Sequence, residues 1–258
     1  MTVGSINLEG KSAVVIGGTS GIGRAIALGF ANAGADVAAT SRRSEEVENA
    51  AREIEKLGRR TLRVTSDVTD RASLERLLDA TVKVFGKVDI LLNAAGRTKR
   101  TPTLDLPESE WNSIIETNLT GALRASQVFG RHMLDRHYGR IIHIASLSTF
   151  VSLYEVAAYS ASKAGIGALT KSLAIEWGRQ GVTVNAIAPG VIKTPLNEKL
   201  IDGTPRGNEL LMRTPLKRFG TTDELAGAAV FLASDAAAFV NGEIICVDGG
   251  FLASGVNQ

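Results

Sequence analysis

Short apolar segments alternate along the chain with longer segments of helical pattern. The apolar segments are rich in valine and isoleucine and mostly lack polar alternation, as expected for strands that are covered on both faces. They lie at 12–17, 35–40, 61–66, 88–95, 140–145, 182–188 and 243–247. The predicted helices between them lie at 22–33, 44–57, 71–85, 108–137, 156–178 and 222–234.

This alternation predicts an α/β, doubly wound fold, with a seven-stranded parallel sheet and helices on both faces. A chain of 258 residues is near the upper size for one hydrophobic core, so residues 1–258 are expected to form a single domain. From Pro189 to Gly220 the chain has four of its six prolines and no clear strand. Such an excursion is often a lid or a binding loop, which predicts a substrate-binding lid at about 190–217.

Charge and cysteine content narrow the class of protein. The net charge of +2 provides no field that would recruit nucleic acid or an anionic membrane. No segment approaches the ~20 apolar residues of a membrane span, and the first residues do not resemble a signal peptide. Cys246 is the only cysteine; it lies in an apolar segment and is expected to be buried. We therefore expect a cytoplasmic protein with a small-molecule partner.

The first apolar segment leads directly into the sequence GGTSGIGRAIALGF. Gly17, Gly21 and Gly23 fall at the expected strand-to-helix turn, where glycine permits positive φ angles and a close approach of the backbone to a ligand. The free N–H groups at the start of the following helix attract phosphate. The pattern predicts a site for a dinucleotide pyrophosphate, although its G-x-x-x-G-x-G spacing departs from the commoner G-x-G-x-x-G. A purely structural turn is the alternative.

The second apolar segment ends in ATSRRSEE and bears on the identity of the cofactor. An NAD site usually has a carboxylate about 20 residues downstream of the glycines, where it holds the ribose, but none appears here before Glu45. Ser41 and Arg42 offer a hydroxyl and a guanidinium to a 2′-phosphate. NADP(H) is therefore favoured, and NAD(H) is possible. Alternatively, Arg42 and Arg43 only pair with glutamates of the next helix.

Several short motifs, taken in order and spacing, make the chain similar to the short-chain dehydrogenases/reductases from Gly10 to Gly250. The motifs are GGTSGIG (17–23), Asp67-Val68, NAAG (93–96), Asn118, Ser146, YSASK (159–163) and Pro189-Gly190. The resemblance implies a Rossmann fold and an NAD(P)-dependent oxidoreductase that interconverts a secondary alcohol and a ketone. Two positions depart from the family pattern: Ile16 replaces a frequent threonine, and Ala94 replaces a common second asparagine.

The resemblance also implies a map of the cofactor site. Asp67 and Val68 would flank the adenine, while Ile192 and Thr194 would meet the carboxamide. The complete set of expected cofactor-binding residues is Gly17, Thr19, Ser20, Gly21, Ile22, Gly23, Ser41, Arg42, Asp67, Val68, Asn93, Ala94, Gly96, Tyr159, Lys163, Pro189, Gly190, Ile192 and Thr194.

Tyr159 and Lys163 are four residues apart in a predicted helix, so they share one face of it. Taken alone, they are read as a tyrosine with a satisfied hydroxyl and a lysine that extends to solvent. The resemblance implies instead that Tyr159 donates a proton to a ketone. A cation ~4 Å away, at an effective dielectric of ~20, supplies the roughly 4 kcal/mol needed to bring the phenol pKa from ~10 to ~7. Lys163, helped by an oxidised nicotinamide, is expected to be that cation.

Two further residues complete the expected catalytic group. Ser146 follows a predicted strand at its carboxyl end, where open α/β sheets bind ligands, and would orient the reacting oxygen. A turn or cap serine is the alternative role, and Ser148 is a rival. The resemblance implies that Asn118 anchors a water that links Lys163 to solvent. Asn118, Ser146, Tyr159 and Lys163 are thus the expected catalytic residues.

Substrate recognition is expected in the segments 97–104, 147–156 and 190–216. The expected substrate-binding residues are Arg97, Ser146, Ser148, Phe150, Tyr154 and Tyr159. The basic side chains of Arg97, Lys99 and Arg100 would suit a carboxylate, although an ordinary solvated loop is an equal alternative. Within the family, the chain most resembles gluconate 5-dehydrogenases and ketogluconate reductases, which implies a sugar-acid substrate.

Other functions fit parts of the same pattern. A 3-oxoacyl thioester reductase is the nearest alternative, followed by a broad carbonyl reductase. A non-catalytic, cofactor-binding regulator is the alternative from another class. No metal site is expected, because His132, His137 and His143 show no ligand spacing. The resemblance implies a homotetramer formed through the helices at 108–137 and 156–178.

Overall fold

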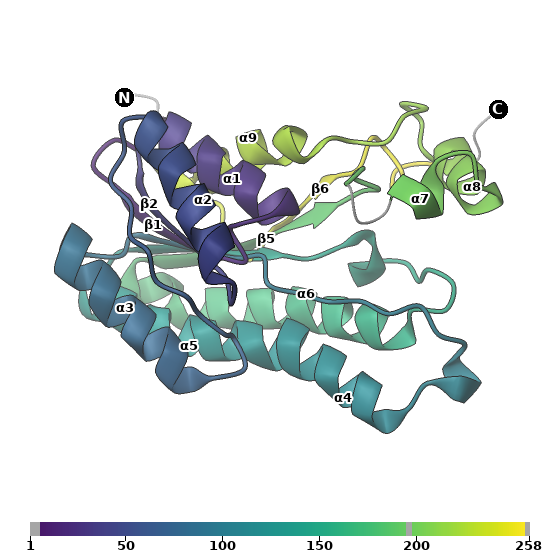
Figure 1. The fold of residues 1–258 in the computed structure, drawn as a ribbon, viewed down its shortest axis with the longest axis horizontal. Helices are drawn as coiled ribbons and strands as arrows, with labels where there is room; N and C mark the ends of the chain where they lie inside the picture. The colour runs from purple at the N-terminus through teal and green to yellow at the C-terminus, as the bar shows by residue number, and fades with distance from the viewer. Residues whose placement is uncertain (1–5, 195–197, 256–258) are drawn as a thin grey trace.

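The computed structural model describes residues 6–194 and 198–255. Within them a parallel six-stranded sheet lies between two layers of helices (Figure 1). The strand order is β2-β1-β3-β4-β5-β6, so the chain changes direction across the sheet between β1 and β3, and open sheets bind ligands at such a point. The strands are β1 (Ser12–Ile16), β2 (Asp36–Thr40), β3 (Ile90–Asn93), β4 (Gly139–Ile144), β5 (Val182–Pro189) and β6 (Ile244–Val247).

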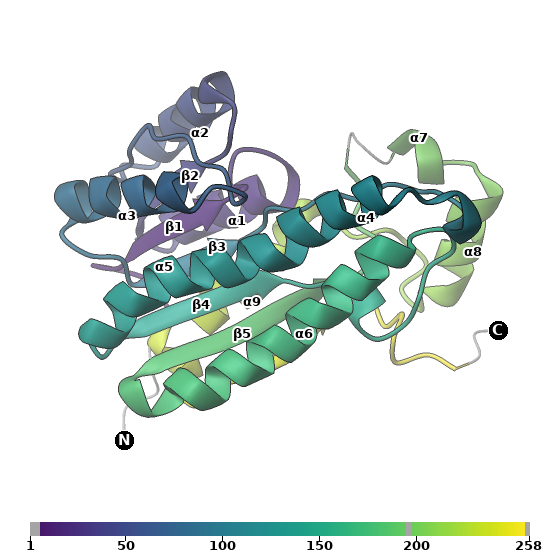
Figure 2. The ribbon, with the colours of Figure 1, turned by 90° about the horizontal axis from the view of Figure 1, so that it is seen from below.

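The described helices divide between the two faces of the sheet. One layer contains α1 (Gly21–Asn32), α2 (Ser44–Lys56) and α9 (Ala226–Ala233). The other contains α3 (Arg71–Phe85), α4 (Glu108–Ile115), α5 (Gly121–Asp135) and α6 (Ala157–Trp177), and Figure 2 shows this layer from below. The short helices α7 (Glu198–Ile201) and α8 (Pro205–Arg213) lie apart from both layers, at one end of the molecule.

The apolar strands have no polar face because both of their faces are buried. In β1, Ala13 and Val15 enter the core beneath α1 and α9, while Val14 and Ile16 enter the core beneath α3 and α5. Burial of apolar surface on each face stabilises the fold by roughly 25 cal/mol per Å², and this is the main contribution that holds the helices to the sheet.

The predicted seventh strand, 61–66, is not a strand in the described structure. The segment is extended and runs beside β2. In the described structure its main-chain hydrogen bonds to that part of the sheet lie near its ends, where the Val37 N–H donates to the Arg60 carbonyl and the Ser66 N–H donates to the Ser41 carbonyl. Between these bonds, the Thr40 hydroxyl donates a 2.6 Å hydrogen bond to the Val64 carbonyl. A side chain therefore replaces the main-chain ladder, and the prediction of seven strands is wrong by this one.

The predicted helix 108–137 is divided by a π-helical turn, Glu116–Thr120, between α4 and α5. The excursion after β5 likewise contains helices where only irregular chain was predicted. Thr204 caps α8 by accepting the Gly207 N–H at 3.0 Å, and Leu210 packs into a small core with Leu147 and Phe251. That core fixes α8 to the segment that follows β4.

Cys246 is exposed, which contradicts the expected burial. It lies on β6, which in the described sheet is an edge strand paired with β5 alone, so this strand is less covered than the central ones. Among the described residues, no helix combines the length and the apolar character needed to span a bilayer.

Candidate active site

Lys163 is fixed to the sheet by its own side chain. Its Nζ donates a 2.6 Å hydrogen bond to the carbonyl oxygen of Ile144, the last residue of β4. The side chain is 5% exposed, and its Nζ lies 5.6 Å from the centre of the Tyr159 ring. The lysine therefore does not extend to solvent, and the pair shares the helix face that looks onto the carboxyl end of β4.

Ser146 joins this pair from the segment after β4. Its hydroxyl caps the short helix Leu147–Thr149 by accepting the Ser148 N–H at 3.1 Å. The same side chain hydrogen-bonds with Tyr159. The capping contact and the contact with Tyr159 thus coexist in one residue, and the structure brings Ser146, Tyr159 and Lys163 together, while the catalytic role of Ser146 remains a prediction.

Burial dominates the protonation of both titratable groups. Burial raises the pKa of Tyr159, and the hydrogen bond from Ser146 opposes this only in part. Burial lowers the pKa of Lys163 to about 8. The expectation that Lys163 draws the Tyr159 pKa toward neutrality is not met by the protein groups alone. Its Nζ is engaged with Ile144, and burial is the largest influence on the Tyr159 hydroxyl.

Asn118 lies in the π-helical turn and is almost fully buried. Its side chain holds the backbone of Arg97 from both sides, since Oδ1 accepts the Arg97 N–H at 2.8 Å and Nδ2 donates to the Arg97 carbonyl at 2.9 Å. Nδ2 also donates to Ser162 at 3.0 Å. Such turns frequently mark functional positions within helices. The water-anchoring role of Asn118 remains a prediction.

The expected cofactor residues follow the carboxyl ends of neighbouring strands. Gly17 follows β1, Ser41 follows β2, Asn93 ends β3 and Pro189 ends β5. Beyond Gly190, Ile192 forms an isolated bridge with Gly220. Because the strands are parallel, these positions lie along one edge of the sheet, where the point of reversal between β1 and β3 is also found.

The glycine turn forms a backbone cradle that fits a dinucleotide. Gly17 has φ +74°, and a Cβ there would lie 2.9 Å from the backbone of Ala94. A Cβ on Gly23 would lie 2.1 Å from the Gly17 carbonyl. Side chains are therefore excluded from the space between this turn and the start of α1, and main-chain N–H groups can approach a pyrophosphate.

The two arginines after β2 have different surroundings. Arg43 pairs with Glu46, whose carboxylate also accepts the Thr19 hydroxyl at 3.1 Å. In the part of the chain that the structure describes, Arg42 forms no ion pair. The alternative in which both arginines pair with the next helix is therefore correct for Arg43 only. Although burial opposes it, hydrogen bonds from Thr69 hold the pKa of Asp67 below its ordinary value, with help from Arg42.

The basic side chains at the expected mouth of the site are paired. Arg97 donates to Ser113 and, at 2.5 Å, to Glu110. Lys99 lies 3.6 Å from the same glutamate. Arg100 Nε lies 2.6 Å from a carboxylate oxygen of Glu155. Neither glutamate was expected at this place from the sequence, because each is distant along the chain from the cation it meets.

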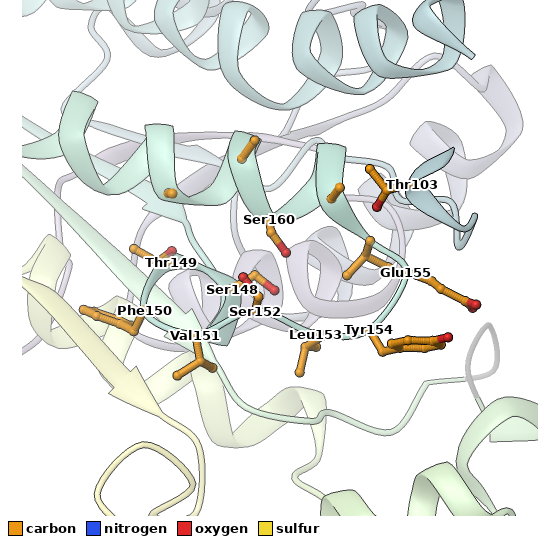
Figure 3. Close-up of a pocket in the computed structure, with 14 residues that line it drawn as sticks. Thr103, Ser148, Thr149, Phe150, Val151, Ser152, Leu153, Tyr154, Glu155 and Ser160 are labelled. Atoms are coloured by element: carbon orange, nitrogen blue, oxygen red, sulfur yellow. The ribbon is translucent and has the colours of Figure 1, made fainter. Parts of the chain in front are cut away.

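A cavity of about 690 Å³ lies between the segment after β4 and α6 (Figure 3). Three expected substrate residues line it, namely Ser148, Phe150 and Tyr154. Its opposite wall includes Ala161, which at about 100° per residue is turned roughly 200° from Tyr159 on α6. Ala161 therefore faces away from Tyr159, while Glu155 lines the same cavity, and the substrate role of the three expected residues remains a prediction.

His143 is a buried residue of this region for which no role was predicted. It lies on β4, with Nε2 3.4 Å from the Ser126 hydroxyl and with Nδ1 unpaired among the described residues. Burial, reinforced by Lys163, lowers its pKa to about 4, so the ring is neutral. The only sign in the sequence that His143 is unusual is its place as a lone histidine within an apolar strand segment. No three His, Cys, Asp or Glu side chains of the described residues gather to form a metal site.

Residues 17–252 match the family described as Enoyl-(Acyl carrier protein) reductase. The chain belongs to the short-chain dehydrogenases/reductases. It is 42% identical over 250 residues to a 2-dehydro-3-deoxy-D-gluconate 5-dehydrogenase of Bacillus subtilis, covering 96% of this chain and 97% of that one. It is also 42% identical to a D-threitol dehydrogenase of Mycolicibacterium smegmatis, covering 95% and 94%.

The fold also matches that of a crystallised protein similar to this chain. A gluconate 5-dehydrogenase of Burkholderia cenocepacia, in complex with NADP and tartrate, superposes with a TM-score of 0.94 at 35% identity. The match covers 98% of this chain and 99% of that one. The predicted family, the α/β fold and the assignment as an oxidoreductase of this family are thereby confirmed.

Proposed function

We propose that this short-chain dehydrogenase/reductase interconverts a secondary alcohol and a ketone of a sugar acid, with NADP(H) preferred over NAD(H). The observation that carries the proposal is the cluster of Ser146, Tyr159 and Lys163 at the carboxyl end of β4. The glycine cradle at the end of β1 lies along the same edge of the sheet. A hydride donor and a proton donor would thus meet at one substrate carbonyl.

Each side chain has a defined task in this proposal. The bound nicotinamide supplies or accepts the hydride. In reduction, the Tyr159 hydroxyl donates a proton to the substrate oxygen, and the Ser146 hydroxyl orients that oxygen. Lys163 has a pKa of about 8, close enough to neutrality to pass a proton onward to Tyr159. Asn118 fixes the Arg97 backbone beside this group and, as predicted from the family, anchors the water that leads to solvent.

The preference for NADP(H) is supported by the contrast after β2. Arg42, without an ion-pair partner among the described side chains, is available for a 2′-phosphate, and Ser41 lies next to it. Carboxylates near this position, such as Glu46, are already engaged with Arg43 and Thr19. The relative from Burkholderia cenocepacia was crystallised with NADP.

A sugar acid is favoured by the relatives and by the charge at the mouth. Arg97, Lys99 and Arg100 carry three positive charges, and Glu110 and Glu155 carry two negative ones, which leaves one net positive charge. One positive charge suits a monocarboxylate. The similarity to a D-threitol dehydrogenase supports a neutral polyol as the second candidate substrate.

The decisive test is a substrate panel with NADPH and NADH in parallel. We expect oxidation of NADPH with 5-ketogluconate to exceed that with an acetoacetyl thioester, with a neutral diketone, or with NADH. D-Threitol and D-gluconate would be compared in the reverse direction with NADP⁺. Preference for the thioester or for D-threitol would replace the sugar acid, and activity restricted to NADH would overturn the phosphate site. Cofactor binding without turnover of any compound would favour the non-catalytic regulator.

We further propose a single domain with a lid at about 190–217, assembled as a homotetramer in the cytoplasm. Among the described residues, α7 and α8 and their core contact with Leu147 support the lid. The exposed small residues of α6, including Ala161 and Ala164, would allow a second copy to pack closely. Light scattering tests the assembly, since a mass of four chains of 27.2 kDa is expected.

A further inference from the structure

We propose that Glu155 is a specificity-determining residue, whose carboxylate occupies Arg100 until the carboxylate of a substrate takes its place. The inference rests on the proposed function, because it assigns the residue that governs recognition of the acid group. It also predicts that acids and neutral substrates respond differently to changes at Glu155.

The Arg100–Glu155 pair joins two of the expected substrate segments, 97–104 and 147–156. The Nε of Arg100 lies 2.6 Å from Oε2 of Glu155, and the Thr101 N–H donates to the Glu155 carbonyl at 2.8 Å. The guanidinium also lies 5.8 Å from the centre of the Tyr154 ring. The Glu155 side chain is 19% exposed and that of Arg100 is 53% exposed. An anion from solvent therefore has access to the cation more readily than to its partner.

The backbone at Glu155 shows that its side chain matters. Its φ of +63° lies in the left-handed region, which is unfavourable for a residue with a Cβ and which glycine adopts freely. The main-chain bond from Thr101 would form equally well with glycine at this position. Unfavourable backbone conformations persist where the surrounding contacts fix them, and they are enriched at functional sites. A glutamate that retains this cost points to a role for the carboxylate on Arg100.

The Arg100–Glu155 pair is close but weakly aligned, in contrast to the hydrogen bonds of the nearby Arg97. Arg97 donates hydrogen bonds to both Ser113 and Glu110, so both of its terminal nitrogens are engaged. In the described part of the chain, Arg100 and Glu155 make contact without an aligned hydrogen bond. Because planar bidentate geometry gives the strongest arginine–carboxylate pairs, a mobile carboxylate that offers such geometry would displace Glu155.

This exchange has different consequences for the two candidate substrate classes. A sugar acid that binds Arg100 must displace Glu155, so the glutamate weakens acid binding. A neutral polyol leaves the pair intact and leaves no unpaired cation beside the site. Loss of the carboxylate at position 155 should therefore favour acids and leave neutral substrates unchanged.

The test compares the parent enzyme with Glu155→Gln, Arg100→Gln and the double variant. For 5-ketogluconate we expect Glu155→Gln to lower KM three- to tenfold at unchanged kcat, and Arg100→Gln to raise it at least tenfold. In the double variant the change at Glu155 should have no effect, because its target is gone. KM for a neutral diketone should remain within twofold of the parent in all three.

Two further variants and a binding measurement guard the test against misfolding and against a wrong choice of substrate. Glu155→Gly removes the carboxylate and also suits the left-handed backbone, so it should fold and reproduce Glu155→Gln. Glu48→Gln, which removes a carboxylate of α2 that pairs with the exposed Arg63, should behave as the parent. Calorimetric binding of D-gluconate in the presence of NADP⁺ gives the same comparison without turnover.

The possible failures are distinguishable. If the parent reduces another substrate class but Glu155→Gln still tightens binding of D-gluconate through Arg100, the proposed function fails and the role of Glu155 stands. If the parent reduces 5-ketogluconate and neither variant changes its KM, the role of Glu155 is overturned and the proposed function stands. Equal changes for the acid and the diketone, or no gluconate binding by any variant, would also overturn it.

Discussion

Lys163 donates a 2.6 Å hydrogen bond to the main-chain oxygen of Ile144, and no carboxylate of the described residues pairs with it. The ammonium is thus buried against a neutral dipole. A cation removed from water without a counter-ion is costly, which is why burial lowers the pKa of Lys163 to about 8. The candidate catalytic site therefore carries a cost in stability, which can be measured directly.

Lys163→Met should stabilise the fold at pH 7 while it abolishes activity. The folded pKa lies below that of the unfolded chain, so below pH 8 the protein bears the full cost of burying the charge. That cost corresponds to about 3 kcal/mol at ~1.4 kcal/mol per pKa unit. Between pH 8 and about 10.5 the unfolded chain binds more protons, and the parent should gain stability relative to the variant. Urea unfolding of both proteins at pH 7 and pH 9.5 measures the difference.

Lys171→Met, at an exposed position of the same helix, is the matched control and should change the free energy of unfolding little at either pH. A Lys163→Met protein less stable than the parent at pH 7 would show that the hydrogen bond to Ile144 outweighs the cost of burial. A difference that does not narrow at pH 9.5 would contradict the lowered pKa.

Tyr159→Phe should reduce kcat on the order of 10²–10⁴-fold, because a positioned proton donor contributes about that factor. Only the hydroxyl is lost, together with its hydrogen bond to Ser146, so the cost in stability should be near 1 kcal/mol. NADPH binding, followed by the fluorescence of the reduced cofactor, should stay within a few-fold of the parent. Unchanged turnover in this variant would exclude Tyr159 as the proton donor.

The pKa of Tyr159 also sets the direction of its pH dependence. Because burial raises this pKa, the hydroxyl is protonated near neutrality and ready to donate in reduction. Alcohol oxidation needs the deprotonated form, so its kcat should rise with pH above neutrality, while kcat for reduction should fall at high pH. Steady-state pH profiles in both directions check this expectation. A parallel dependence in the two directions would point to another titrating group.

Gly23→Ala should abolish measurable cofactor binding. The added Cβ would lie 2.1 Å from the Gly17 carbonyl, a backbone atom, so the whole glycine turn would have to move. Gly227→Ala in α9 is the matched control, because a Cβ there meets no atom within 4 Å and alanine favours helix. The control should bind NADPH normally and unfold at the same or a slightly higher temperature. Normal NADPH binding by Gly23→Ala would show that the turn has room to relax.

The sequence predicted the parts of the fold that local patterns determine. Strands covered on both faces consist of unbroken apolar residues, and the glycine turn and the YSASK spacing have strict local requirements. The segment 61–66 has the composition of a strand, but pairing depends on its neighbour, where Thr40 replaces a main-chain bond. The π-helical turn was not predicted either, because the only sign of it in the sequence is Asn118, a polar residue within a helix.

Long-range pairing accounts for what the sequence did not predict at the site. The basic residues of 97–104 were visible in the sequence, but Glu110 and Glu155 meet them only through folding. The position of Lys163 was likewise predicted correctly, whereas its bond to Ile144 depends on how α6 packs against β4. Burial of the Tyr159 hydroxyl, which also depends on packing, raises the tyrosine pKa where the sequence predicted a lowered one.

Arg42→Ala should raise KM for NADPH about ten- to a hundredfold and change KM for NADH little. A hydrogen bond to a charged group is worth about 1.5–3 kcal/mol, and only NADPH has the 2′-phosphate that would use it. Arg43→Ala is the matched control, because Arg43 is already paired with Glu46 and has less to offer a phosphate. Its effect on NADPH should be several-fold smaller. Equal losses for both cofactors would mean that Arg42 supports the loop rather than the phosphate, and a larger loss in Arg43→Ala would transfer the role to that residue.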